Sequence, residues 1–218
     1  MPFKQTAYQV IEQIIMFCNQ GKWKKVSKKK KFRTEFANEE EAFNDYFRIG
    51  ISVNWTQANK MALKLYEQFY ASDIIVASPL ALRTLCGHHV DSKARDMSEK
   101  VDQDFLSSIE FVVLDQTEAF CYQNLEHLEE VLGAVNQRPK KLTQINDICR
   151  IMEIYSEEPK DGSRMSNPLF RQTISVHKFL SLDLQEMLFE FQKTIRPRVE
   201  IEQIQPNRAE ILAKTLKL

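Results

Sequence analysis

The sequence contains little glycine and no glycine-rich phosphate-binding motif. Five glycines occur among its 218 residues. The patterns GxxxxGK[ST], GxGxxG and GxSxG need glycines at fixed spacing, and none of the three is present. Gly21 and Lys22 form the nearest approach, but no glycine precedes them at the required distance. These residues therefore provide no loop that could cradle a phosphate group.

Cysteine is also sparse, and no C-x-x-C pair occurs. The wide spacing of the four cysteines favours reduced, buried thiols over a disulfide framework, and hence the cytosol or nucleus. The adjacent His88 and His89 point apart and have no Cys or carboxylate at ligand spacing, so we predict no metal site. The cysteines are Cys18, Cys86, Cys121 and Cys149.

Net charge and long apolar runs are absent too. Thirty Lys and Arg residues balance thirty Asp and Glu residues, so no overall field attracts nucleic acid or membrane. No run approaches the roughly eighteen apolar residues of a membrane span, and polar residues interrupt the N-terminal stretch at helical spacing. We expect a soluble protein without a membrane partner, in which any affinity for polyanions is local.

What is present is an alternation of helix and strand patterns. We predict strands at 48–53, 73–79, 109–114 and 172–177, and helices at 7–18, 58–69, 79–85, 125–135, 142–155 and 180–191. Residues 87–103 are charged without periodicity and predict a surface loop. Alternating strands and helices indicate an α/β fold with a parallel sheet and helices on both faces.

A basic insertion at 22–33 is the strongest local charge feature. Its lysines, with Trp23 and Phe32 beside them, could neutralise several phosphate groups. A solvated insertion screened by Glu39 to Glu41 and a nuclear-localisation signal are the alternatives. The candidate RNA contacts in this run are Lys28, Lys29, Lys30 and Lys31.

Ligands of open parallel sheets bind beyond the carboxyl ends of the strands, so the residues that follow the predicted strands are the candidate site. Four stretches there resemble motifs of DEAD-box RNA helicases. PFKQTA at 2–7 resembles P-T-R-E-L-A, and IIVASP at 74–79 resembles V-A-T-P-G-R. VVLDQTE at 112–118 resembles V-L-D-E-A-D, and RQTISV at 171–176 resembles R-Q-T-L-L-F.

Three further stretches of the sequence point to one particular family. FRIG at 47–50, YASDIIVASPLALRT at 70–84 and DFLSSIE at 104–110 are similar to the digestive-organ expansion factor family. That family is a helicase-like nucleolar component of the small-subunit processome. The resemblance implies pre-ribosomal RNA processing in the nucleolus, with pre-ribosomal RNA, small nucleolar RNA and processome proteins as partners.

The resemblance implies a RecA-like helicase lobe 1, but a degenerate one. Gln116 replaces the catalytic glutamate in the motif formed by Asp115, Gln116, Thr117 and Glu118, and an amide cannot accept a proton from water. His177 to Phe179 replace S-A-T, and too few residues follow Phe191 for a second lobe. We therefore expect no enzyme activity, no catalytic residue and no cofactor.

The expected domain is one lobe at 1–195, truncated at its N-terminal side and followed by a tail or linker at 196–218. By resemblance, Lys4, Ser78 and Arg83 are further candidates for contact with RNA phosphates. A plain strand-to-helix turn is the alternative for Ser78. For Asp115, a helix or turn cap is the alternative to a residual metal-binding role.

Three functions fit these residues. The first is a non-catalytic, helicase-like scaffold in small-subunit ribosome biogenesis that binds RNA, processome proteins or both. The second is a fragment of an active ATP-dependent DEAD-box RNA helicase. The third is an α/β interaction module that has lost contact with RNA.

Overall fold

A computed structural model of the chain describes residues 1–20, 25–38, 42–55, 61–87, 102–141 and 171–191, together with 199 and 201. The α-helices are α1 (Lys4–Gln20), α2 (Lys29–Phe36), α3 (Pro79–Cys86), α4 (Leu125–Ala134) and α6 (Leu182–Phe191). The strands are β1 (Lys25–Ser27), β2 (Arg48–Trp55), β3 (Met61–Leu65), β4 (Ile74–Ala77), β5 (Phe111–Asp115) and β6 (Gln172–Val176). Short 3-10 helices are η2 (Phe69–Ala71), η3 (Asp104–Leu106) and η4 (Thr117–Cys121).

The described strands form two sheets. The larger has the order β1-β3-β2-β4, and the smaller pairs β5 with β6 in parallel. The α/β class is confirmed, but the larger sheet is mixed, because β2 runs antiparallel to β3 and to β4. Since β2 ends at Trp55 and β3 begins at Met61, the connection is too short for the crossover of about a dozen residues that parallel neighbours need.

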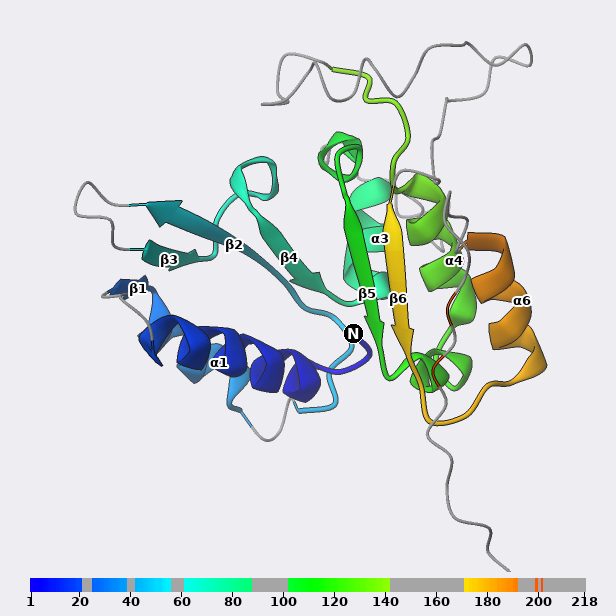
Figure 1. Cartoon of the computed structure of the whole chain (residues 1–218), viewed down its shortest axis with the longest axis horizontal. Helices are drawn as coiled ribbons and strands as arrows, with labels where there is room; N and C mark the ends of the chain where they lie inside the picture. Colours follow the sequence, from blue (N-terminus) through cyan, green and yellow to red (C-terminus); the bar gives the residue numbers. More distant parts are fainter. Residues whose placement is uncertain are drawn as a thin grey trace, which may run out of the picture.

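Helices α1 and α2 cover one face of the larger sheet (Figure 1). Ile11 and Ile15 lie four residues apart on α1, so they share one helix face, and both are fully buried. The strands meet this face with residues two apart, which point to the same side of a sheet. These strand residues are Ile49, Ile51, Leu63 and Leu65.

The basic insertion predicted at 22–33 is partly regular structure. Residues 25–27 form β1, which pairs in parallel with β3, and α2 begins at Lys29. Phe32 and Phe36 lie four residues apart on α2 and are buried against the larger sheet's core. A solvated insertion would not bury these rings, so the aromatic residues anchor the lysines to the fold.

Residues 58–69, predicted as a helix, include β3 and the start of η2. The apolar residues at 62, 65 and 69 fit helical spacing, but Leu63 and Leu65 also alternate at strand spacing. Pairing with β2 on one edge and β1 on the other decides between the two patterns.

Gly50 allows the bend after β3 to lie close against β2. A Cβ atom at this position would come 2.3 Å from Ser72 Oγ and 2.5 Å from the carbonyl oxygen of Glu67. The backbone nitrogen of Glu67 also donates to the carbonyl of Gly50 over 3.0 Å. A side chain here would therefore force apart the strand and the bend that leads to β4.

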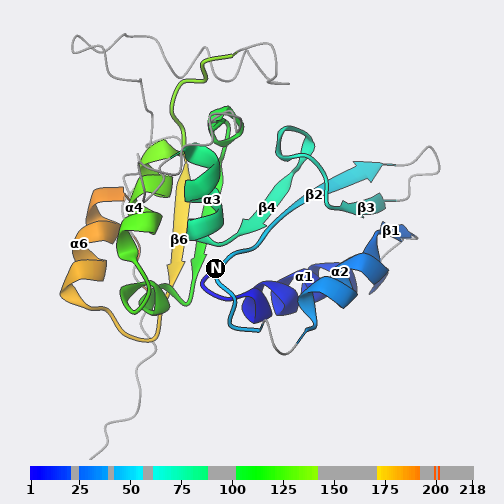
Figure 2. The ribbon, with the colours of Figure 1, turned by 180° about the vertical axis from the view of Figure 1, so that it is seen from behind.

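The smaller sheet has helices on one face, which Figure 2 shows from behind the view of Figure 1. Leu114 of β5 packs with Leu128 and Leu132 of α4 and with Leu184 and Leu188 of α6. The expected strands at β4, β5 and β6 and the helices at α3, α4 and α6 agree with the structure. Most of the loop 87–103, the helix predicted at 142–155 and most of the tail 196–218 lie outside the described residues.

Arg171 joins the helices to the start of β6. Its side chain is 2% exposed, and its guanidinium donates to the backbone carbonyls of Leu132, Val135 and Phe191 over 2.9 to 3.4 Å. Burial lowers the pKa of Arg171 to about 10. These carbonyls lie at the ends of α4 and α6, where helices leave acceptors free, so the cation satisfies groups that would otherwise lack partners.

Within the described ranges, none of the helices combines the length and apolarity needed to cross a lipid bilayer.

Candidate functional site

The residues that follow β5 connect its carboxyl end to that of β6. Thr117 is fully buried, and its Oγ1 donates or accepts hydrogen bonds at 3.0 to 3.2 Å. Its partners are the Leu114 carbonyl, the Ser175 hydroxyl and the Val176 carbonyl. A hydroxyl is the one small side chain that both donates and accepts, which suits it to bridge two strand ends.

Glu118 makes a second connection between the same segments. The residue is 9% exposed, and Oε2 accepts a hydrogen bond from the backbone nitrogen of Lys178 at 3.3 Å. Lys178 lies in the stretch that occupies the place of S-A-T. Thr117 and Glu118 therefore hold the end of β6 and the loop after it, and neither side chain is turned to solvent.

Gln116 takes a left-handed backbone conformation, with φ of 51° and ψ of 50°. A non-glycine residue there is uncommon, and the conformation sets the sharp turn between β5 and η4. Asp115, the last residue of β5, is partly exposed and lies near the N-terminal amino group. Burial lowers the pKa of the Met1 amino group to about 6, and the Asp115 carboxylate partly opposes this shift.

Ser78 lies at the turn between β4 and α3 and caps helix α3. Its side chain is fully buried, and Oγ accepts a hydrogen bond from the Ala81 nitrogen at 3.2 Å. The Phe47 nitrogen, at the start of β2, lies 3.5 Å from the same oxygen. Pro79 occupies the first turn, where a missing N–H costs nothing.

Lys4 and Arg83 are buried within the protein. Lys4 is 5% exposed, and its Nζ lies 5.4 Å from the centre of the Phe36 ring. Arg83 is 7% exposed, donates to Glu130 at 2.7 Å, lies 3.7 Å from Glu126 and contacts His127. The Arg83 contacts join α3 to α4. Burial and the neighbouring Arg83 lower the pKa of His127.

The lysines at the start of α2 face solvent. Lys28, Lys30 and Lys31 are exposed and Lys29 is half-buried. Lys28 is the N-cap residue of α2, with a left-handed backbone, and its side chain makes no cap hydrogen bond. The first turn of α2 contains no acidic residue.

Four lysines at a helix N-terminus oppose the helix dipole, which favours anions there. Each unfavourable cation costs about 0.3–1 kcal/mol when exposed. The arrangement therefore creates a strongly positive spot at some expense of helix stability. Combined with the free N–H groups of the first turn, it is suited to bind phosphate oxygens.

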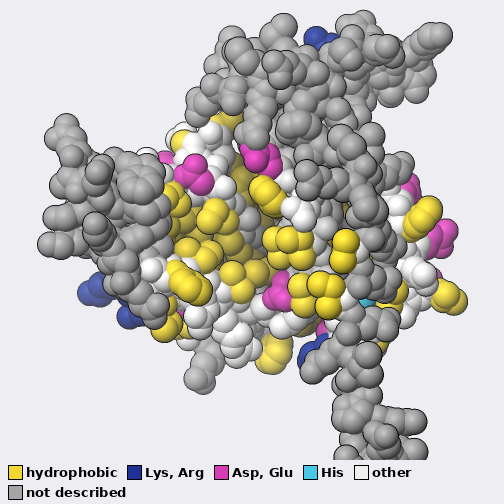
Figure 3. Space-filling model, in the orientation of Figure 1, with side chains coloured by type: hydrophobic (Ala, Val, Ile, Leu, Met, Phe, Trp, Pro, Cys, Tyr) yellow, Lys and Arg dark blue, Asp and Glu magenta, His cyan; other side chains and the backbone are white. Residues whose placement is uncertain are grey.

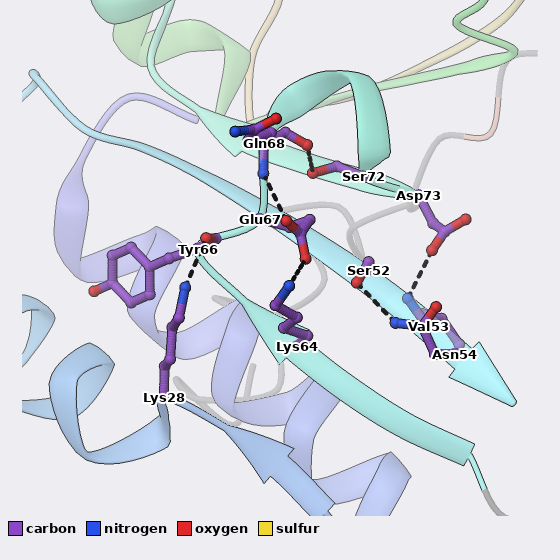
Figure 4. Close-up of polar contacts among 10 residues, drawn as sticks. All are labelled: Lys28, Ser52, Val53, Asn54, Lys64, Tyr66, Glu67, Gln68, Ser72 and Asp73. Carbon is purple, nitrogen blue, oxygen red and sulfur yellow. Dashed lines mark hydrogen bonds and ion pairs between the residues drawn. The ribbon is translucent and has the colours of Figure 1, made fainter. Parts of the chain in front are cut away.

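Tyr66 organises two of these lysines, as Figure 4 shows for Lys28. Lys28 Nζ donates to the backbone carbonyl of Tyr66 at 3.1 Å, and Lys31 Nζ lies 4.5 Å from the Tyr66 ring centre. The Tyr66 hydroxyl donates to Glu35 over 2.7 Å. Burial and this carboxylate raise the pKa of Tyr66.

Tyr66 was not predicted as a site residue, because nothing in its sequence neighbourhood connects it with the lysines. Its backbone φ is 56°, which belongs to the turn that ends β3. A second fixed contact involves Arg33 on α2, which makes a bidentate ion pair with Glu12 of α1 at 2.7 and 2.8 Å. This ion pair holds the pKa of Glu12 below its usual value.

The structure thus separates the candidates into three places. Residues 115–118 lie at the ends of β5 and β6, and Lys28 to Lys31 lie at the start of α2. The remaining candidates are buried at helix starts or between helices; these are Lys4, Ser78 and Arg83. No group of three or more potential metal ligands occurs among the described residues. His88 and His89 are outside that part of the chain.

Comparison with known proteins identifies the family of the chain. Residues 1–196 match the family model described as "UTP25, NTP hydrolase-like domain". No solved structure is significantly similar to the chain.

Curated relatives carry the name U3 small nucleolar RNA-associated protein 25. The chain is 32% identical over 200 residues to the Schizosaccharomyces japonicus protein, covering 84% of this chain and 28% of the relative. The Sclerotinia sclerotiorum protein is 28% identical over 233 residues, covering 100% of this chain and 29% of the relative. The Xenopus tropicalis homolog is 34% identical over 158 residues, covering 64% and 19%.

The chain therefore spans less than a third of the length of these relatives. The family match spans all four helicase-like stretches and the lysines at the start of α2, and it confirms the resemblance seen in the sequence. The chain belongs to the UTP25 family, and residues 1–196 are its NTP hydrolase-like domain.

Proposed function

We propose that the chain is a non-catalytic, helicase-derived lobe that acts in small-subunit ribosome biogenesis in the nucleolus. In this role it binds pre-ribosomal RNA or the U3 small nucleolar RNA, together with processome proteins. The names of the relatives support a role in the small-subunit processome, and the description of the family model supports descent from an NTP hydrolase. The RecA-like character of the lobe belongs to the same proposal.

The geometry after β5 supports a lobe without NTP hydrolysis. An NTPase needs a phosphate loop and a carboxylate that positions the attacking water. Residues 1–218 contain no GxxxxGK[ST] loop, and the residue after Asp115 is an amide. Thr117 and Glu118 make internal hydrogen bonds to β6 and its following loop, so this motif now has a structural role.

One observation carries the RNA-binding part of the proposal: four consecutive lysines stand at the N-terminus of a helix whose other face is anchored in the core. Phe32 is fully buried and Phe36 is 3% exposed, so α2 is held in place before any ligand arrives. Because the backbone is already ordered, binding a phosphate chain costs little additional entropy. Lys4, Ser78 and Arg83 are positioning residues in this proposal, since their side chains are buried.

The test compares two triple variants of the purified chain. Lys28→Glu, Lys30→Glu and Lys31→Glu remove the exposed charges of α2. Lys140→Glu, Lys141→Glu and Lys178→Glu change three other exposed lysines by the same charge. Binding of a labelled single-stranded pre-ribosomal RNA is followed by fluorescence anisotropy at several salt concentrations.

We expect the first variant to lose at least tenfold in affinity and to lower the salt slope by about two, since each phosphate contact contributes about 0.7. The control variant should retain both. Glutamate favours a helix N-terminus, so the first variant should remain folded, which circular dichroism checks. Equal loss in both variants, or no RNA binding by the unmodified chain, would contradict the lysine surface.

A further inference from the structure

A pocket of about 430 Å³ opens where four segments of the chain meet. These segments are the stretch before β2, the start of α3, η4 with the turn after it, and the start of α4. Its apolar walls are formed by Pro79, Leu80 and Phe120. Ligand pockets usually measure about 300–1,000 Å³. The pocket therefore has the size of a ligand site, and of the described residues neither the lysines of α2 nor those that join β5 to β6 line it.

Asp45 provides a carboxylate at this pocket. The residue is half-buried, and no hydrogen bond or ion pair connects its side chain to another described residue. The adjacent backbone is fixed, because the Asn44 carbonyl accepts from the Lys4 nitrogen at 3.0 Å. Asn44 Oδ1 also accepts from the Tyr46 nitrogen at 2.8 Å. A carboxylate held beside apolar walls favours a cationic ligand, since partial burial penalises an unpaired charge.

The ring of Tyr122 forms another side of the pocket and is held by Phe179. The two rings meet at 72°, with their centres 6.4 Å apart. Tyr122 is still 79% exposed, so its ring has open surface for a ligand. A planar guanidinium stacks on an aromatic ring and pairs with a carboxylate through two hydrogen bonds, whereas the ammonium group of lysine is a point charge. Asp45 and Tyr122 thus favour arginine among the cationic side chains.

His127 and Asn124 add hydrogen-bond donors beside the carboxylate. His127 Nδ1 contacts the Arg83 guanidinium, which can only donate, so the proton of the neutral ring lies on Nε2. Asn124 Oδ1 accepts from the Glu126 nitrogen at 3.1 Å, and its NH2 group can donate to a ligand. Backbone carbonyls of a bound peptide are suitable acceptors for both groups.

The charge around the pocket favours a protein ligand over a nucleic acid. Asp45 lines the pocket, and no Lys or Arg is among the described residues that do so. The Glu126 side chain, in the first turn of α4, is 61% exposed and adds negative charge nearby. Like charges repel, so these carboxylates weaken the binding of a phosphate chain. A polypeptide can supply a cation and carbonyl acceptors together.

Exposed apolar side chains lead from the smaller sheet toward this pocket. Figure 3 shows hydrophobic side chains gathered over β5 and β6. Val176, the last residue of β6, is 52% exposed, and Phe179, which contacts the Tyr122 ring, is 47% exposed. Interfaces between proteins are enriched in aromatic residues and arginine. A partner segment with an apolar residue next to an arginine therefore fits this surface.

We propose that this pocket receives an arginine side chain of a partner protein. The guanidinium pairs with the Asp45 carboxylate and lies against the Tyr122 ring. Carbonyls of the same partner segment accept hydrogen bonds from Asn124 and His127. The inference rests on the protein-binding part of the proposed function and gives that partner its chemistry. It does not depend on RNA binding by the lysines of α2.

Four small probes test the pocket directly. They are N-acetyl-arginine methylamide, its lysine and citrulline counterparts, and uridine monophosphate. Citrulline matches arginine in shape but carries no charge. Each probe is titrated into the isotope-labelled chain, and binding is followed by the amide NMR signals of Leu80, Gln123 and His127. Signals from β2 and β3 report that the chain remains folded.

Three variants accompany the titrations. Asp45→Asn removes the charge and keeps the shape, and Tyr122→Leu removes the ring. Asp183→Asn removes an exposed carboxylate on α6 and is the matched control. We expect the arginine probe to bind at least about fivefold more tightly than the citrulline probe, and the first two variants to weaken its binding by about fivefold. The control variant should bind it like the unmodified chain.

The inference would be overturned if the arginine probe left the pocket signals unchanged or bound no better than citrulline. Equal binding of this probe by the Asp45→Asn variant and the unmodified chain would also overturn it. Tighter binding of uridine monophosphate at the pocket would overturn it in favour of an RNA site.

Co-purification of processome proteins with the tagged chain tests the proposed function separately. Absence of all these proteins would contradict the protein-binding role of the chain. Their presence, together with a pocket that does not respond to the arginine probe, would overturn the arginine site alone.

Discussion

Thr117 and Ser175 join the ends of β5 and β6 through a hydrogen bond of 3.0 Å between their hydroxyl groups. Thr117 lies at the third position of the helicase-like D-Q-T-E motif, and Ser175 lies just before the place of S-A-T. In this family member the two regions are thus coupled by a fixed, buried contact. The coupling stabilises the strand ends and requires no nucleotide.

Replacing Thr117 with Val tests this structural role. The change keeps the side-chain shape but removes the hydroxyl, leaving the Ser175 hydroxyl and the Val176 carbonyl without this partner. We expect the free energy of unfolding to fall by about 1–3 kcal/mol, the usual cost of losing a buried hydrogen bond.

Chemical denaturation measures this change, and Thr34→Val is the control. Thr34 is exposed on α2, and its hydroxyl bonds the Lys30 carbonyl one turn earlier. Its replacement should change stability by less than about 0.5 kcal/mol. Equal effects of the two substitutions on the free energy of unfolding would show that the buried Thr117 contact does not stabilise the fold.

Arg83→Ala separates a structural role of Arg83 from RNA contact. The substitution removes a partner of the half-buried Glu130 carboxylate between α3 and α4. Breaking a largely buried ion pair costs about 3–5 kcal/mol, and partial exposure of Glu130 reduces the expected loss to about 2 kcal/mol.

The salt dependence of RNA binding is the second measurement on this variant. Because the guanidinium is directed into the protein, the salt slope should match that of the unmodified chain. A lower slope without loss of stability would place Arg83 on the RNA and not between the helices.

The Met1 amino group predicts a dependence of stability on pH. Its pKa is about 6 in the folded chain against 8.0 for the free group, so between pH 6 and 8 the unfolded chain binds more protons. Stability should therefore be greatest above pH 8 and should fall by about 2 kcal/mol as the pH drops toward 6. Burial also lowers the pKa of His127, so protonation of His127 should lower the stability further at lower pH.

Denaturation at a series of pH values measures this dependence. Acetylation of the N-terminus removes the titrating amine and should flatten the curve between pH 7 and 8, where histidine contributes little. A curve that keeps its full slope after acetylation would rule out Met1 as the source.

Gln116→Glu tests the absence of hydrolysis. The substitution restores the carboxylate that an active DEAD-box enzyme uses, while the chain still has no phosphate loop. We expect neither the unmodified chain nor the variant to release phosphate from ATP above the background rate, with or without RNA. RNA-stimulated phosphate release by the unmodified chain would favour the alternative of an active helicase.

The sequence was sufficient for the elements with strong patterns. The apolar run at β4, the β5 strand before Asp115 and the helical spacing of α4 each carry a local signal that tertiary contacts did not override. β1 and β3 were missed because a three-residue strand among lysines has no periodicity, and Leu63 and Leu65 sit in a stretch that also fits a helix. Pairing with β2 decided those cases.

The place of the candidate residues in the fold was predictable, but their contacts were not. The rule that ligands bind beyond strand ends drew attention to residues 115–118, which lie at the end of β5. It could not show that Thr117 and Glu118 face β6, because their partners lie 58 to 60 residues later in the chain. Similarly, Arg83 is directed toward Glu126 and Glu130 on α4, and the pairing of β1 with β3 brings Lys28 and Tyr66 together.

In-cell crosslinking of the tagged chain, followed by sequencing of the attached RNA, tests the central claim most directly. We predict enrichment of pre-ribosomal spacer, small-subunit or U3 sequences, lost with the Lys28, Lys30 and Lys31 variant and kept with the Lys140, Lys141 and Lys178 variant. Crosslinks that both variants retain equally, or no enrichment of these RNAs with the unmodified chain, would contradict RNA binding by the lysines at the start of α2.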